Sequence, residues 1–172
     1  MDTKITDKMK PTYVGFKHKE YKWKPDIDYR KNPHLYEIGR GQQGVLVCEP
    51  YKSQIGKHWR FKNPKIAEKS AETIYKMFIS YLLEGDFVGA DMAKKYLHMG
   101  FTRSRRYANH KSGVKWKKSV GKWKVLPQEE DWETSEKALS AKIFKRYWDK
   151  ARLHGGYLKL KNEFKNWKSE TI

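Results

Sequence analysis

Residues 63–100, NPKIAEKSAETIYKMFISYLLEGDFVGADMAKKYLHMG, decide the fold because they encode two helices separated by a short break. Asn63 followed by Pro64 is typical of a helix start, in which asparagine caps the helix and proline takes its first position. Apolar residues then recur at helical spacing up to about Glu84, which predicts a long helix with one buried face.

The second helix is predicted to begin after the break at Gly85-Asp86. It spans Phe87 to Met99 in this interpretation, and Gly100 forms its C-terminal cap because glycine readily adopts the left-handed backbone found there. So short a connection predicts that the two helices pack as an antiparallel hairpin.

Two more helices are predicted toward the C-terminus. Apolar residues at helical spacing indicate the first over about 136–152, with Thr134 or Ser135 as its cap and Gly155-Gly156 as its end. A shorter helix over about 157–167 follows. The overall prediction is a mainly α fold with a small β element (α+β), in which small antiparallel hairpins accompany the helices.

The N-terminal part is predicted to hold a mobile basic arm, residues 1–12, followed by a single globular domain over residues 13–172. The glycine-rich segment 39–44, GRGQQG, lacks the strand before it and the helix after it that nucleotide-binding loops require. We interpret it as a tight turn that leads into a buried strand at 45–48, with residues 58–61 as the partner strand.

The charge of the 172-residue chain constrains its partners, since 38 Lys and Arg stand against 20 Asp and Glu, a formal net charge of +18. A compact body with that surplus repels itself unless an anion offsets it. Aromatic residues make up 15% of the chain, which excludes a wholly disordered chain. No apolar run approaches the ~20 residues of a membrane span, and no signal peptide is visible. The lone Cys48 lies in an apolar run, so we expect a buried, inert thiol in a reducing cytoplasm.

Half of the surplus charge lies in residues 101–124, which contain nine basic and no acidic side chains. Four aromatic residues are interleaved with them. Lys and Arg release counterions from a phosphate backbone, and flat rings stack on unpaired bases. The apolar residues of this stretch do not recur at helical spacing, which argues against a membrane-binding helix. We therefore predict nucleic-acid contact, DNA or RNA, largely independent of sequence, and keep an acidic host or virion protein as the alternative partner.

The predicted contacts centre on three arginines within four positions, because planar guanidinium groups suit phosphate oxygens or a guanine edge. The alternative is a purely structural role, in which one arginine pairs with a carboxylate such as Asp86 or Asp91 and supports the local structure. The full set of predicted contacts is Arg103, Arg105, Arg106, Tyr107, Asn109, His110, Lys111, Lys115, Trp116, Lys117, Lys118, Lys122, Lys124 and Arg60.

Residues 114–117 and 122–125 alternate apolar and cationic side chains, which predicts a small hairpin with aromatics on one face and lysines on the other. The segment around them is interpreted as mostly loop or ribbon. An acidic cluster at 129–136 suits the N-terminus of the helix that follows. A second interpretation is that these acids mask the basic stretch in the free protein.

Catalytic and metal-binding patterns are weak. The six histidines are scattered and neither HExxH nor CxxC occurs, so no metal and no other cofactor is predicted. A nuclease-type or nucleic-acid-modifying enzyme remains the enzymatic alternative, and it would use Asp26, Asp28, Glu49, Lys52 or His58. Glu49 and Lys52 are three positions apart with a proline between them, so they would not share a strand face as nuclease carboxylate and lysine do.

Three long segments carry a family resemblance: WKPDIDYRKNP (23–33), GRGQQGVLVCEPYKSQIGKHWRFKNP (39–64) and FVGADMAKKYLHMGFTRSRRYANHKSG (87–113). They resemble the domain-of-unknown-function family numbered 4385, which occurs in bacteria and phages. The resemblance covers about residues 21–115. It implies a cytoplasmic protein, in the host cytoplasm if phage-encoded, and it implies no activity, cofactor or site residue.

Overall fold

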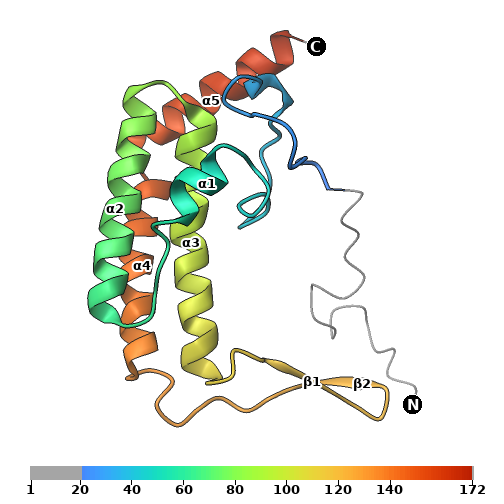
Figure 1. The fold of residues 1–172 in the computed structure, drawn as a ribbon, viewed down its shortest axis with the longest axis vertical. Helices are drawn as coiled ribbons and strands as arrows, with labels where there is room; N and C mark the ends of the chain where they lie inside the picture. Colours follow the sequence, from blue (N-terminus) through green and yellow to red (C-terminus); the bar gives the residue numbers. More distant parts are fainter. Residues whose placement is uncertain (1–20, 172) are drawn as a thin grey trace.

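The computed structural model describes residues 21–171, so the predicted arm at residues 1–12 lies outside the described part. The fold is mainly helical with one small antiparallel sheet, as predicted (Figure 1). Its elements in chain order are a short 3-10 helix η3 (Pro33–Leu35), α1 (Tyr51–Gly56), α2 (Pro64–Leu83), α3 (Phe87–Asn109), β1 (Trp116–Ser119), β2 (Lys122–Val125), α4 (Glu136–Arg152) and α5 (Gly155–Glu170).

Helices α2, α3 and α4 form the body, and α5 crosses one end of it (Figure 1). The predicted helical hairpin is confirmed, because α2 and α3 pack against each other across the break at Gly85. The predicted starts are confirmed as well. Asn63 accepts a hydrogen bond from the backbone N–H of Ile66, and Ser135 accepts one from Ala138. Within residues 21–171, no helix is both long and apolar enough to cross a bilayer.

The predicted end of the second helix at Gly100 is wrong, because α3 continues through Gly100 to Asn109. The glycine serves a helix–helix contact instead of a cap. A Cβ atom placed on it would lie 2.2 Å from Cδ1 of the buried Phe144 on α4. The residues 101–109 that we expected in a loop or ribbon are therefore the last turns of a rigid helix.

The predicted strand at 45–48, with 58–61 as its partner, is also wrong. Residues 41–47 form turns, and the backbone N–H groups of Val47 and Cys48 both donate to the carbonyl of Gly44, which has φ 91°. Val45 and Cys48 are buried while Leu46 is 61% exposed, a spacing of three and not the spacing of two that a strand requires. Cys48 is a free, buried thiol as predicted.

Helix α5 differs from the shorter helix expected over 157–167. It has 16 residues, begins at Gly155 and is capped by the His154 side chain, which accepts from the Gly156 N–H. The glycines that were expected to end α4 thus form the first turn of α5. Tyr157 and Phe164 are its buried residues.

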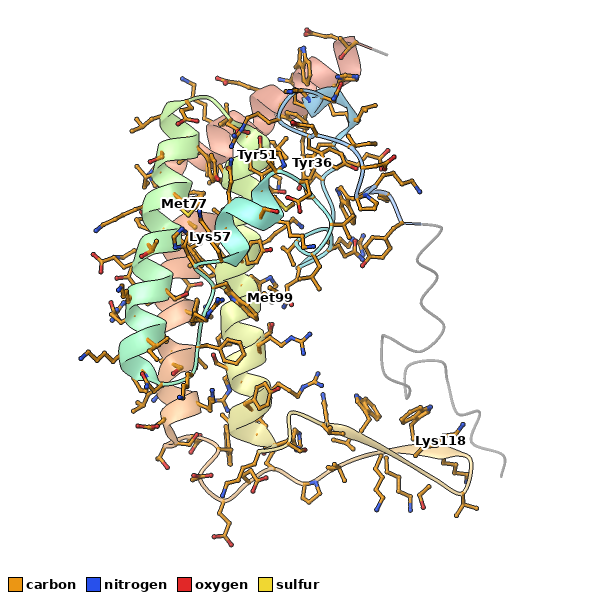
Figure 2. The ribbon with its side chains drawn as sticks, viewed as in Figure 1. Tyr36, Tyr51, Lys57, Met77, Met99 and Lys118 are labelled. Atoms are coloured by element: carbon orange, nitrogen blue, oxygen red, sulfur yellow. The ribbon has the colours of Figure 1, made fainter. Side chains whose placement is uncertain are left out.

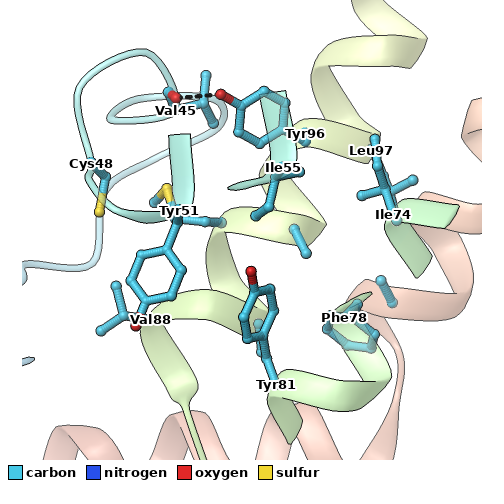
Figure 3. Close-up of a cluster of buried hydrophobic side chains, with 14 of the residues drawn as sticks. Val45, Cys48, Tyr51, Ile55, Ile74, Phe78, Tyr81, Val88, Tyr96 and Leu97 are labelled. Carbon is cyan, nitrogen blue, oxygen red and sulfur yellow. Dashed lines mark hydrogen bonds between the residues drawn. The ribbon is translucent and has the colours of Figure 1, made fainter. Parts of the chain in front are cut away.

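The core is rich in tyrosines whose hydroxyl groups find partners. Tyr51, Tyr81 and Tyr96 lie around Ile55 and Phe78 in Figure 3, and the Tyr96 hydroxyl donates to the Val45 carbonyl at 2.7 Å. Each of these hydrogen bonds fixes the orientation of a large ring that is otherwise apolar and buried.

Buried charges tie the N-terminal segment and α5 to α3. The Asp91 carboxylate is fully buried and accepts hydrogen bonds from the hydroxyls of Tyr36 and Tyr157. One turn further, the Lys95 ammonium is 1% exposed and donates to the carbonyls of Gly39 and Gly41 at 2.9 and 3.0 Å. The segment GRGQQG therefore wraps a buried lysine, and burial lowers the pKa of Lys95 to about 8.

Candidate nucleic-acid interface

The basic stretch 101–124 is divided between two elements, the last turns of α3 and the β1–β2 hairpin. The hairpin projects sideways from the end of α3, away from the packed helices (Figure 1). Its side chains stand off the ribbon, with Lys118 labelled among them in Figure 2. At its base, Gly113 adopts φ 72° and a Cβ there would lie 2.8 Å from the ring of Tyr107. That close contact joins the hairpin to the helix.

The strand register gives the hairpin two different faces. Trp116 pairs with Val125 and Lys118 with Trp123, so these four side chains share one face. The other face carries Lys117 opposite Lys124, and Ser119 opposite Lys122. The predicted separation of aromatics from lysines is confirmed, apart from Lys118, which lies with the tryptophans.

The lysine face is electrostatically unfavourable in the isolated protein. Lys117 and Lys124 are directly opposed, and like charges at such positions destabilise a sheet. Lys122 adds a third exposed ammonium to the same face. An anion held against this face would remove the repulsion.

The tip of the hairpin is a two-residue turn in which both residues have positive φ, Val120 at 49° and Gly121 at 75°. Turns of this kind favour Asn-Gly, and a β-branched residue with positive φ is strained. Val120 is 98% exposed, so no packing offsets the strain.

Two of the three predicted arginines face solvent on α3. Arg103 is exposed and Arg106 is partly exposed, and their spacing of three places them on neighbouring positions of one face. Neither is paired with Asp86 or Asp91 as the alternative proposed. Asp86 lies 3.6 Å from Arg30, and Asp91 lies 3.3 Å from Lys94.

The Arg105 side chain is engaged in contacts with other residues of the protein. Its guanidinium donates to the Asn109 side-chain oxygen at 2.9 Å and to the Trp132 carbonyl at 3.0 Å, and it lies over the Trp132 ring at 5.5 Å. It therefore braces the returning segment 126–135 against α3. Asn109 is engaged in the same contact, although both residues were predicted to touch nucleic acid.

The remaining predicted residues differ in how accessible they are. His110 caps α3 and is 5% exposed, so its ring is turned inward. Tyr107 packs against Phe61, with ring centroids 5.9 Å apart. The Arg60 guanidinium donates to the Trp59 carbonyl at 2.7 Å but stays exposed. The other predicted residues have exposed or partly exposed side chains: Lys111, Lys115, Trp116, Lys117, Lys118, Lys122 and Lys124.

The cations of 101–124 lack acidic partners. Among residues 21–171, none of these nine side chains forms an ion pair, whereas cations of α4 pair with Glu68 and Asp149 at 2.6–2.8 Å. The acidic cluster approaches the stretch only through the backbone, where the Glu129 carboxylate accepts from the Lys111 N–H at 3.1 Å. Within the described residues, no ion pair therefore neutralises a cation of the stretch.

Of the residues of the nuclease alternative, the structure brings Asp28 and Glu49 together in an isolated parallel β-bridge, and both carboxylates are engaged in local hydrogen bonds. Asp28 accepts from the backbone N–H groups of Arg30 and Lys31 at 3.0 Å, as a turn residue does. The Glu49 carboxylate accepts from the Ser53 hydroxyl at 2.8 Å. Searched over residues 21–171, the structure brings no three His, Cys, Asp or Glu side chains together as a metal site.

A pocket of about 400 Å³ beside Arg103 was not foreseen. Its walls come from three separate segments, including Tyr21, Trp23, Gln42 and Met99. The Gln42 amide donates to the Thr102 hydroxyl on α3 at 2.5 Å, which fixes the loop against the helix. No spacing in the sequence signals this pocket, because it depends on how residues 21–47 fold back over α3.

Comparison with known proteins gives one match. A family described as Domain of unknown function (DUF4385) matches residues 19–167, a range that includes the hairpin and nearly all of both C-terminal helices. No curated protein and no solved structure matches the chain.

Proposed function

We propose that this chain, which belongs to the DUF4385 family, binds nucleic acid through phosphate contacts that do not depend on base sequence. The observation that supports the proposal is a projecting hairpin that places Lys117 directly opposite Lys124, in a stretch of nine cations and no acids. A polyanion along this face would relieve the repulsion between the lysines and release its own counterions.

The binding surface would have two parts. Lys117, Lys122 and Lys124 form the lysine face of the hairpin, while Arg103 and Arg106 extend the positive surface along α3. Ammonium groups act as mobile point charges and guanidinium groups as planar donors, so both suit phosphate oxygens. None of these contacts reads a base edge, and the expected selectivity between base sequences is small.

The test is the salt dependence of binding to a labelled polynucleotide. Replacing the three hairpin lysines, Lys117→Gln, Lys122→Gln and Lys124→Gln, should lower the slope of log K against log salt by about 2–3, since each lost phosphate contact contributes ~0.7–0.9. Affinity at low salt should fall at least tenfold. The matched control replaces Lys65, Lys142 and Lys159, three exposed lysines on α2, α4 and α5. It removes the same charge from other surfaces.

Equal effects of the two triple variants would show a diffuse charge effect and contradict the assignment to the hairpin. A parent protein that binds no polynucleotide at low salt would contradict the function itself. Recovery of one acidic protein after nuclease treatment, with no polynucleotide binding, would favour the acidic partner instead.

The proposal includes a cytoplasmic location, where nucleic acid is available and a free thiol persists. Cys48 is buried, and burial raises the pKa of its thiol to about 12. A thiol held protonated in this way is inert toward disulfide exchange.

A further inference from the structure

Trp116 and Trp123 are large apolar side chains outside the hydrophobic core. Neither belongs to the core cluster or packs against it, and within the described residues 21–171 neither ring contacts another aromatic ring. Each has a lysine ammonium near its ring instead: Lys115 lies 5.7 Å from the centroid of Trp116, and Lys118 lies 5.9 Å from that of Trp123. Both indole rings thus lie among cations on the projecting hairpin.

The strand register places both tryptophans on one face of the hairpin. The Leu126 N–H donates to the Lys115 carbonyl, so the next pair, Trp116 with Val125, and the pair of Lys118 with Trp123 are non-hydrogen-bonded pairs. The two tryptophans are therefore diagonal neighbours on one face. Diagonal side chains are separated by about 7–8 Å. Both rings therefore lie within reach of the same short stretch of a bound strand.

We infer that Trp116 and Trp123 stack on unpaired bases, so that the hairpin selects single-stranded nucleic acid over duplex. The inference rests on the proposed function and adds the kind of strand to it. Bases in a duplex are stacked on each other and present only their edges, whereas a single strand can turn the face of a base toward an aromatic ring. Lys115 and Lys118, beside the two rings, meet the phosphates that flank such a base.

A nucleic acid fits this face better than an acidic peptide. Carboxylates alone would satisfy the lysines and leave the flat indole faces in water. A nucleotide supplies a negative phosphate and a flat base within one repeating unit, and the hairpin alternates cations with rings in the same way. Stacking does not distinguish DNA from RNA, so both enter the test.

The experiment compares labelled oligothymidylate, oligouridylate and a blunt duplex of the same length. Trp116→Leu with Trp123→Leu removes both rings and keeps apolar bulk, while Trp116→Phe with Trp123→Phe is the matched control that keeps aromatic rings. The Leu pair should lose roughly 30-fold or more in affinity for both single strands, since stacking contributes ~1–3 kcal/mol per base. The Phe pair should retain most of the affinity. Duplex affinity should change less than about twofold, and the salt slopes should stay those of the parent.

An equal loss on duplex and single strands, or no loss on single strands, overturns the inference. If the parent binds with a steep salt slope and removal of the rings has no effect, the inference fails while the proposed function stands. If the parent binds nothing, both fail. Should the Leu pair lose the hairpin, indole proton shifts of the parent with oligothymidylate decide. Upfield movement of Trp116 and Trp123 supports stacking, and unmoved rings overturn it.

Discussion

Gly100→Ala tests the close contact between Gly100 on α3 and Phe144 on α4. Gly100 is the residue at which the sequence predicted that the helix would end. The added Cβ would lie 2.2, 2.4 and 2.6 Å from three ring carbons of Phe144, where ordinary contact begins at 3.4 Å. Phe144 is fully buried, so its ring cannot move aside into solvent. The two helices would have to separate by more than an ångström, or the ring would have to leave its preferred rotamer.

Two opposing effects determine the sign of the change. Alanine is favoured over glycine inside a helix by about 1 kcal/mol. Overpacking a buried site costs about 1–3 kcal/mol, and a displacement this large belongs at the upper end of that range. We expect Gly100→Ala to lower the free energy of unfolding by about 1–2 kcal/mol, which corresponds to a fall in Tm of roughly 2–8 °C for a chain of this size. Gly155→Ala is the control, because a Cβ on Gly155, the first residue of α5, meets open space.

A double-mutant cycle separates the close contact from a capping role. Phe144→Leu opens space for the new methyl group, so the double variant should be no less stable than Phe144→Leu alone, with a coupling of about 1–2 kcal/mol. If Gly100 ended the helix in a left-handed conformation, the two changes would add within ~0.5 kcal/mol. Additive denaturant melts, or a Gly100→Ala protein as stable as its parent, would refute the helix–helix contact described for α3.

Three further predictions follow from other features. Arg105→Ala should lower Tm by a few degrees because the Trp132 contact is lost, and it should leave the salt slope of polynucleotide binding unchanged. Arg103→Ala should instead reduce that slope by ~0.7–0.9, the contribution of one phosphate contact. Val120→Asn should relieve the strained turn, and slower amide exchange of the hairpin by NMR would show it. Because the pKa of Lys95 is about 8 when folded against ~10.4 when unfolded, the unfolded state binds more protons between these values, and the contribution of Lys95 to stability should rise on the order of 1–2 kcal/mol from pH 7 to 9.5. Denaturant melts measure this rise as the difference between the parent and Lys95→Met, because the raised pKa of Cys48 acts in the opposite direction in both proteins. An equal change of stability with pH in the two proteins would contradict the prediction.

Local signals in the sequence predicted the helix starts well. Asn63 and Ser135 cap α2 and α4 with their own side chains, an interaction that involves only neighbouring residues. Gly100 misled the prediction because its role is tertiary: it faces Phe144, 44 positions away, and nothing nearby in the sequence marks that partner. The apolar run 45–48 was ambiguous for the same reason, since composition alone does not distinguish a strand from a buried turn.

The candidate interface was predictable in its charge and less so in its individual contacts. The hairpin could be predicted because alternation at a spacing of two is a local pattern, and the register agrees with it. Arg105 and Asn109 could not be separated from Arg103 and Arg106 by spacing. Their partners lie on a segment that returns over α3 from beyond the hairpin.

That returning segment has a mechanical consequence. One leg of the hairpin continues from α3, and the other is tied back to the helix where the Glu129 N–H donates to the Asn109 carbonyl at 2.8 Å and Arg105 grips Trp132. Both legs of the hairpin are thus fixed to α3 before nucleic acid binds. Binding would therefore cost the hairpin little conformational entropy. Arg105 would in this way raise affinity without touching the ligand, because it holds the hairpin in one position.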